Sequence, residues 1–159
     1  MAKNSRQAEF DREFREQIER FTPAVVTALR KIIRTPVPPA IKILAFEMQA
    51  DWRGFPVCAF AMDDEGPDEV YFDPPFKGPL LPKAGRLIPD GAIDQKGYEA
   101  DGVATFEGGA RVMAEWFGEC WAEAGGVAFP LAAYISLHDS SRYYDLRARR
   151  WVRDSDIWP

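Results

Sequence analysis

The sequence predicts an α+β fold in which a mostly antiparallel sheet of about five strands packs against a long helix in the second half of the chain. Residues 105–126 carry apolar side chains at steps of three and four, which is the spacing of one helical face. Short apolar runs bounded by turn-forming residues are typical of strands, and they occur at 41–49, 55–63, 69–73, 131–137 and 142–152. We expect a single domain over residues 1–159.

The helix predicted over 105–126 begins with Thr105 as a candidate N-cap and with Glu107 in its first turn, where the helix dipole favours a carboxylate. Gly125 can supply the left-handed residue that ends a helix. Its apolar face needs a broad partner such as a sheet, and consists of Val112, Met113, Trp116, Phe117, Cys120, Trp121 and Ala124.

The N-terminal part, residues 1–35, predicts two further helices on the same or the opposite face of the sheet. Asn4 or Ser5 can cap the first, whose narrow apolar stripe ends near Phe21. The pair Thr22-Pro23 is a typical helix start, and the second helix is expected to end near Arg34, before a proline-rich connector.

The runs 41–49 and 55–63 predict a hairpin whose strands are apolar on both faces. Such strands lie in the centre of a sheet or at a subunit interface. A third strand is expected over 69–73 within the strand region 41–73. Residues 76–104 lack periodicity and predict a long irregular loop. The last strands, 131–152, include a final hairpin or a ragged edge, and residues 154–159 predict a loose tail.

The formal net charge of −5 argues against a nucleic-acid partner and against docking on anionic membranes. The polar N-terminus and the lack of an apolar run of roughly 20 residues predict a cytoplasmic protein. Cys58 and Cys120 both lie in apolar runs and predict buried, reduced thiols, although the sequence leaves a disulfide open.

Few residues suit metal or cofactor chemistry. There is one histidine and no paired cysteine motif, so we expect no metal site. The carboxylates around 63–68 lack the spacing of an EF-hand, and no glycine-rich nucleotide motif is present, so we expect no cofactor.

His138 is the candidate catalytic residue, because it is the only side chain whose unperturbed pKa lies near neutrality. Asp139 follows it, and Tyr143 is close in the sequence, which together suggest a small hydrolase-like enzyme with His138 in a pocket. The alternative interpretation is a turn histidine whose ring bonds the local backbone.

The charge pattern favours a binding role. Acidic side chains dominate 63–73, and basic ones cluster at Arg142, Arg147, Arg149, Arg150 and Arg153. One interpretation is that these are solvated loops and a charged edge strand. The other is an acidic surface that attracts a basic protein partner. It would use Asp63, Asp64, Asp68 and Glu69, with Trp52, Tyr98 and Trp158 as aromatic anchors.

Residues 104–152 contain the run WFGECWAEAGG, a Phe-Pro strand and the run HDSSRYYDL. This pattern resembles small bacterial proteins without an assigned function, some of which resemble immunity proteins of polymorphic toxin systems. The resemblance implies a cytoplasmic, acidic α+β protein that binds and neutralises a partner.

Three hypotheses therefore follow from the sequence. The first is a protein-binding module of the immunity type. The second is a small enzyme that uses His138. The third is a structural homodimer formed through the apolar first hairpin.

Overall fold

The computed structural model describes residues 2–49, 56–73, 75–81 and 87–159. These residues confirm the α+β class, with a five-stranded, mostly antiparallel sheet in the order β2-β1-β3-β4-β5. The strands are β1 (Ile43–Met48), β2 (Val57–Met62), β3 (Ala132–Leu137), β4 (Arg142–Asp145) and β5 (Arg150–Arg153). All neighbouring pairs are antiparallel except β1 and β3, which run parallel.

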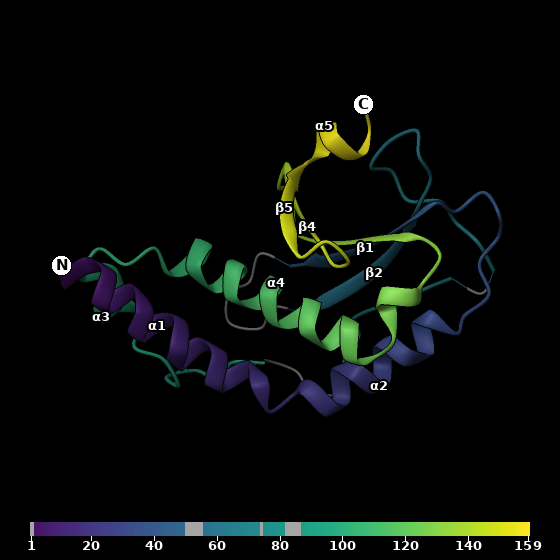
Figure 1. The fold of residues 1–159 in the computed structure, drawn as a ribbon. Coiled ribbons are helices and arrows are strands. Elements are labelled where there is room, and N and C mark those ends of the chain that lie inside the picture. Colours follow the sequence, from purple (N-terminus) through teal and green to yellow (C-terminus); the bar gives the residue numbers. More distant parts are fainter. Residues whose placement is uncertain (1, 50–55, 74, 82–86) are drawn as a thin grey trace.

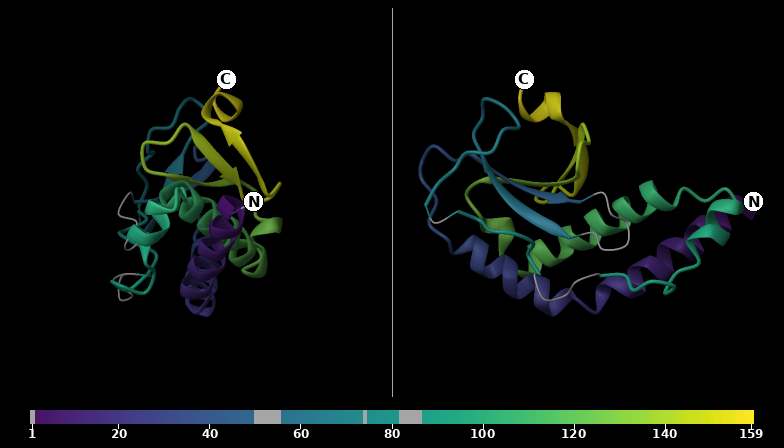
Figure 2. Two further views of the ribbon diagram at one scale, coloured as in Figure 1. Left: turned by 90° about the vertical axis from the view of Figure 1, so that its left-hand side faces the viewer. Right: turned by 180° about the vertical axis from the view of Figure 1, so that it is seen from behind.

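The helices are α1 (Ala2–Glu19), α2 (Thr22–Ile33), α3 (Gln95–Ala100), α4 (Thr105–Glu123), the 3-10 helix η1 (Gly126–Ala128) and α5 (Asp154–Ile157). Figure 1 shows α4 lying along one face of the sheet, with α1 and α2 on the far side of α4. The two further views in Figure 2 show the same order of layers. The N-terminal helices therefore lie on the same side of the sheet as α4, as a second helical layer.

The tryptophans of α4 are buried, as the periodicity predicts. Trp116 and Trp121 are each 1% exposed. The ring of Trp121 packs edge-on against Phe46 of β1, with centroids 5.7 Å apart. Trp116 turns towards α2, where its indole N–H donates to Thr22 Oγ1 at 2.9 Å. α4 is buried on two sides because it lies between the sheet and the N-terminal helices.

The strand β1 is apolar on both sides because the face of the sheet turned away from α4, here named the outer face, also carries an apolar cluster. Leu44, Phe46 and Met48 belong to the main core, whereas Ile43 and Ala45 belong to a second cluster on the outer face. Ile157 and Trp158, in and just after α5, pack on this second cluster. The expected loose tail is therefore wrong, because a short helix covers part of the outer face.

The structure corrects other expectations of detail. Residues 69–73 form no strand, since only Glu69 makes an isolated bridge, to Met62. Prolines at 74 and 75 lack the N–H group that a longer ladder needs. The expected irregular segment 76–104 contains α3. The N-cap of α4 is Ala104 rather than Thr105, whose hydroxyl instead donates to Glu99 at 2.8 Å.

Candidate functional site

The segment that follows β2 is strongly acidic. Residues 63–73 hold six carboxylates and no basic side chain. Asp64, Glu65 and Asp68 are exposed, and Asp63 and Glu69 are half-buried. Backbone bonds fix the segment to the sheet, because Val70 N–H donates to the carbonyl of Ala61 at 2.8 Å. The predicted binding residues Asp63, Asp64, Asp68 and Glu69 thus lie together beside the edge strand β2.

A second segment joins this acidic region from the end of the chain. The indole N–H of Trp158 donates to the backbone carbonyl of Asp63 at 3.1 Å. This contact places the end of α5 next to the loop after β2 (Figure 1). The acidic surface is defined here as Asp63, Asp64, Glu65, Asp68, Glu69 and Asp73.

The carboxylates of 63–73 differ from those of the helices in their pairing. On the helices, Arg15 pairs with Glu119 at 2.6 Å, Arg6 pairs with Glu9 at 2.6 Å, and Arg111 pairs with Asp11. Among the residues that the structure describes, no carboxylate of 63–73 forms an ion pair. No basic side chain of the described residues pairs with their negative charges, and Asp64, Glu65 and Asp68 are exposed to solvent.

Tyr71 lies within this acidic segment and is 82% exposed, as the most exposed large apolar side chain of the described residues. Tyrosine surrounded by polar groups is favoured at protein interfaces. The aromatic anchors expected from the sequence were Trp52, Tyr98 and Trp158. Tyr98 is 3% exposed and packs on Phe10, so it is no surface anchor. Trp158 is half-buried, and Trp52 lies outside the described residues.

His138 follows β3 on the outer face, and both of its ring nitrogens face carboxylates. Nδ1 lies 2.7 Å from Glu47 Oε1, and Nε2 lies 3.4 Å from Asp139 Oδ2. The hydrogen bond to Glu47 raises the pKa of His138, and the charges of Glu47 and Asp139 raise it further. The arrangement favours a protonated imidazolium, which is a poor general base.

The remaining candidate of the enzyme hypothesis, Tyr143, makes other contacts. Its ring packs edge-on against Tyr134 at 6.4 Å and against Trp158 at 5.5 Å. Burial raises the pKa of Tyr143. Burial also raises the pKa of the Cys58 thiol, which is paired in register with Glu47. A thiol with a raised pKa is a weak nucleophile at neutral pH.

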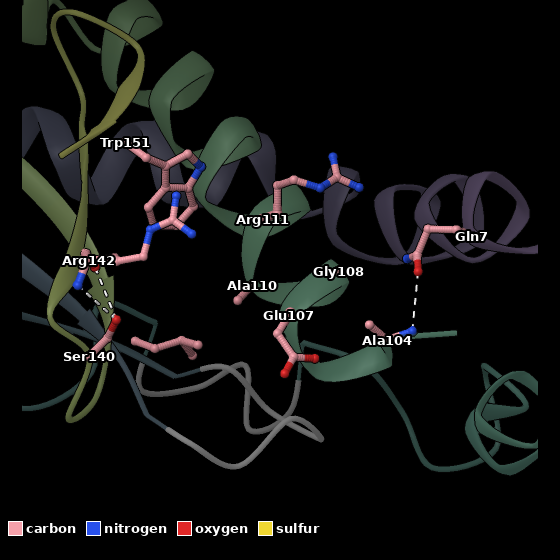
Figure 3. A pocket seen from close by; sticks show the side chains of 10 residues that line it. Gln7, Ala104, Glu107, Gly108, Ala110, Arg111, Ser140, Arg142 and Trp151 are labelled. Carbon is pink, nitrogen blue, oxygen red and sulfur yellow. Dashed lines mark hydrogen bonds between the residues drawn. The ribbon is translucent and has the colours of Figure 1, made fainter. Parts of the chain in front are cut away.

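A groove of about 460 Å³ lies between the start of α4 and the β4–β5 hairpin (Figure 3). In Figure 3, the Arg142 side chain extends along the Trp151 ring, and Glu107 comes from the opposite wall. The Arg142 guanidinium lies 5.4 Å from the centroid of Trp151. A smaller cavity of about 340 Å³ shares Arg142 and Trp151 with this groove. His138 lines neither cavity, nor a third one beside α2.

The described residues contain neither a metal-binding cluster nor a membrane-spanning helix. They hold no group of three or more histidine, cysteine, aspartate or glutamate side chains arranged for a metal ion. None of their helices has both the length and the apolar character needed to cross a bilayer.

Comparison with known proteins gave no relative. A scan against protein-family models found no matching family, and searches among curated proteins and among solved structures found no match.

Sequence reasoning missed three features of these surfaces. The first is the contact between Glu47 and His138. Its one signal in the sequence is that Glu47 is the only charged side chain in the apolar strand β1. The second is the exposure of Tyr71, which lies in the expected strand 69–73 that does not form. The third is α5, which lies in the expected loose tail. Its signal in the sequence is the pair of apolar residues Ile157 and Trp158, which could have indicated a docked helix.

Proposed function

We propose that the protein is a cytoplasmic binding module that neutralises a basic protein partner through the acidic surface. The supporting observation is the set of unpaired carboxylates at 63–73, whereas several carboxylates of α1 and α4 are paired with arginines. Unpaired charges of one sign attract an oppositely charged partner over a Debye length of about 10 Å at 0.1 M salt. The resemblance to immunity proteins supports the neutralising role.

Tyr71 supplies the apolar contact in this proposal. Charged rims chiefly accelerate association, whereas buried aromatic side chains provide much of the affinity. Tyr71 is 82% exposed and lies between Glu69 and Asp73, so a partner that contacts the carboxylates also covers the ring. The expected partner surface is therefore a basic one with an apolar depression at its centre.

The test begins with capture of binding proteins from the source cells at low salt, followed by titration of each purified candidate by calorimetry. We expect the double variant D64N/D68N to bind about tenfold more weakly than the wild type, which is about 1.4 kcal/mol. Y71S is expected to lose at least about 1 kcal/mol. Affinity should also fall as salt rises.

The matched control is E16Q/E123Q. It removes the same two charges from exposed carboxylates on α1 and α4 that form no ion pair with the described residues. This variant should bind like the wild type. If both double variants weaken binding equally, only net charge matters, and the proposed surface is wrong. The same conclusion holds if no candidate binds at low salt.

The two alternatives remain open to direct tests. The enzyme hypothesis is weakened by the 2.7 Å hydrogen bond between His138 and Glu47, because this bond favours the protonated imidazolium. It predicts a hydrolytic activity that H138N abolishes. The homodimer hypothesis arose from the two apolar faces of β1. Because α5 already packs on the second face, that pattern requires no second copy, and sedimentation at high concentration tests it.

A further inference from the structure

The two edge strands of the sheet, β2 and β5, differ in what is hydrogen-bonded to their outer sides. The edge of β2 is occupied by its own chain, since Val70 N–H donates to Ala61 and Leu80 N–H donates to Val57. At the other edge, no described residue forms a ladder with β5 beyond its pairing with β4. An open edge strand offers unpaired backbone groups to another extended segment.

The hydrogen-bond pattern shows which groups of β5 point outwards. Asp154 N–H donates to the carbonyl of Ser141, on the β4 side. The N–H of Arg153 points the other way, because it donates to the Asp156 carboxylate at 2.9 Å. Directions alternate along an antiparallel strand, so the backbone N–H and C=O of Trp151 also point away from β4. Trp151 is thus the residue through which this edge could accept a strand.

The exposed side chains of this edge are mainly basic, and one carboxylate among them, Asp156, lines the smaller cavity and is bonded to the backbone N–H of Arg153. Arg142, Arg150 and Arg153 are exposed, and none forms an ion pair with a described residue. Arg142 is held over the Trp151 ring, at the point where the groove of Figure 3 meets the smaller cavity that Arg153 lines. A guanidinium held in this way can bind a carboxylate through two parallel hydrogen bonds.

We propose that the β5 edge and the adjoining groove bind an extended acidic segment of a partner protein, which adds to the sheet as a strand beside β5. Backbone bonds to Trp151 set the alignment, and alternate carboxylates of the segment pair with Arg142 and Arg153. The occupant is not a second copy of β5, because pairing two copies would place their arginines against one another without compensation. This inference is independent of the acidic surface.

The probe is a short synthetic peptide of alternating glutamate and valine, blocked at both ends and titrated into the full-length protein. Amide spectra are expected to show shifts at Trp151 and its neighbours, and exchange of the Trp151 amide hydrogen should slow on binding. R142Q and R153Q should each weaken binding about tenfold, the effect of losing one charge-assisted pair. R12Q, which removes an exposed arginine of α1, is the matched control and should change nothing.

Several outcomes overturn the proposal. Equal binding of a lysine–valine peptide would show that charge does not select the segment. An absence of shifts at Trp151 would show that the arginines only guard the edge. Shifts at Trp151 that grow with protein concentration alone would identify a second copy as the occupant. R142Q and R153Q must retain the wild-type circular dichroism spectrum, and slowed exchange at Trp151 tests strand addition without any substitution.

Discussion

The carboxylate of Glu47 reaches His138 from the middle of the sheet. Glu47 lies at the end of β1, and its register partner on β3 is Ser136, two residues before the histidine. Gln49 also donates to Glu47, at 2.9 Å. A carboxylate held between two donors is well placed to favour the charged form of the imidazole. The interaction joins the ends of two parallel strands that are far apart in the sequence.

We expect the pKa of His138 to be higher in the wild type than in E47Q. The chain has one histidine, so its Cε1 proton gives a single signal that can be followed by NMR titration. Because Glu47 raises the folded-state pKa, the pair stabilises the fold fully below the unfolded value near 6.5, and the contribution is lost as pH rises through the folded value. An identical titration curve in E47Q would show that Glu47 does not raise the pKa of His138. E16Q serves as the control for a change in net charge.

The sequence identifies His138 but not its partner. A histidine after an apolar strand is visible in the sequence, whereas its contact with Glu47 depends on the parallel pairing of β1 and β3. Parallel neighbours are joined through distant segments, and residues 49–131 separate these two strands. No local pattern sets that register. The residues of the acidic surface, in contrast, are local in sequence, and the run of carboxylates at 63–73 predicts them.

Two glycines allow α1 and α4 to pack closely. A Cβ atom built on Gly109 would lie 2.9 Å from the ring of Phe14, and one on Gly108 would lie 3.3 Å from the ring of Phe10. Both phenylalanines are buried. Glycine costs a helix about 1 kcal/mol relative to alanine, so this sequence gives up helix propensity where the two helices meet.

G109A should therefore destabilise the protein, although alanine is the better helix former. Overpacking costs about 1–3 kcal/mol, which exceeds the gain of about 1 kcal/mol in propensity. The net loss of about 1 kcal/mol corresponds to a fall in Tm of about 2–4 °C, measurable by calorimetry. The same substitution in an F14L background should instead raise Tm, because the smaller side chain leaves room. G66A is the control, since a Cβ there meets nothing within 4 Å. A rise in Tm for G109A alone would contradict close packing.

At the level of elements, the periodicity of apolar residues predicted the helices and strands that bury an apolar face of their own. α1, α2, α4 and the five strands lie close to their expected positions, because each carries its own apolar face. The short helices α3 and α5 were missed. Each is too short to show a helical period, and each is held by contacts with distant residues. Tyr98 of α3 packs on Phe10, and Trp158 after α5 bonds to Asp63.

Across the whole molecule, the sheet separates two apolar clusters, and one cysteine lies on each side of it. Cys120 of α4 belongs to the main core and is 1% exposed. Cys58 is the register partner of Glu47 on the outer face and is partly exposed. Both thiols are free, and the sheet between them accounts for the absence of the disulfide that the sequence left open. Burial raises the pKa of Cys120 to about 12 and raises that of Cys58 less.

This separation predicts that the two thiols report different motions. Iodoacetamide should alkylate Cys58 in the native protein, at a rate below that of a free thiol because its pKa is raised. Cys120 should react only through unfolding, at least about a thousandfold more slowly, since a domain of this size is stable by about 5–15 kcal/mol. Mass spectrometry of C58S isolates the Cys120 reaction, and its rate should rise with urea along the global unfolding transition. Labelling of Cys120 at a urea-independent rate would instead mean that α4 separates from α2 while the sheet stays folded, and the three layers would then not form one cooperative unit.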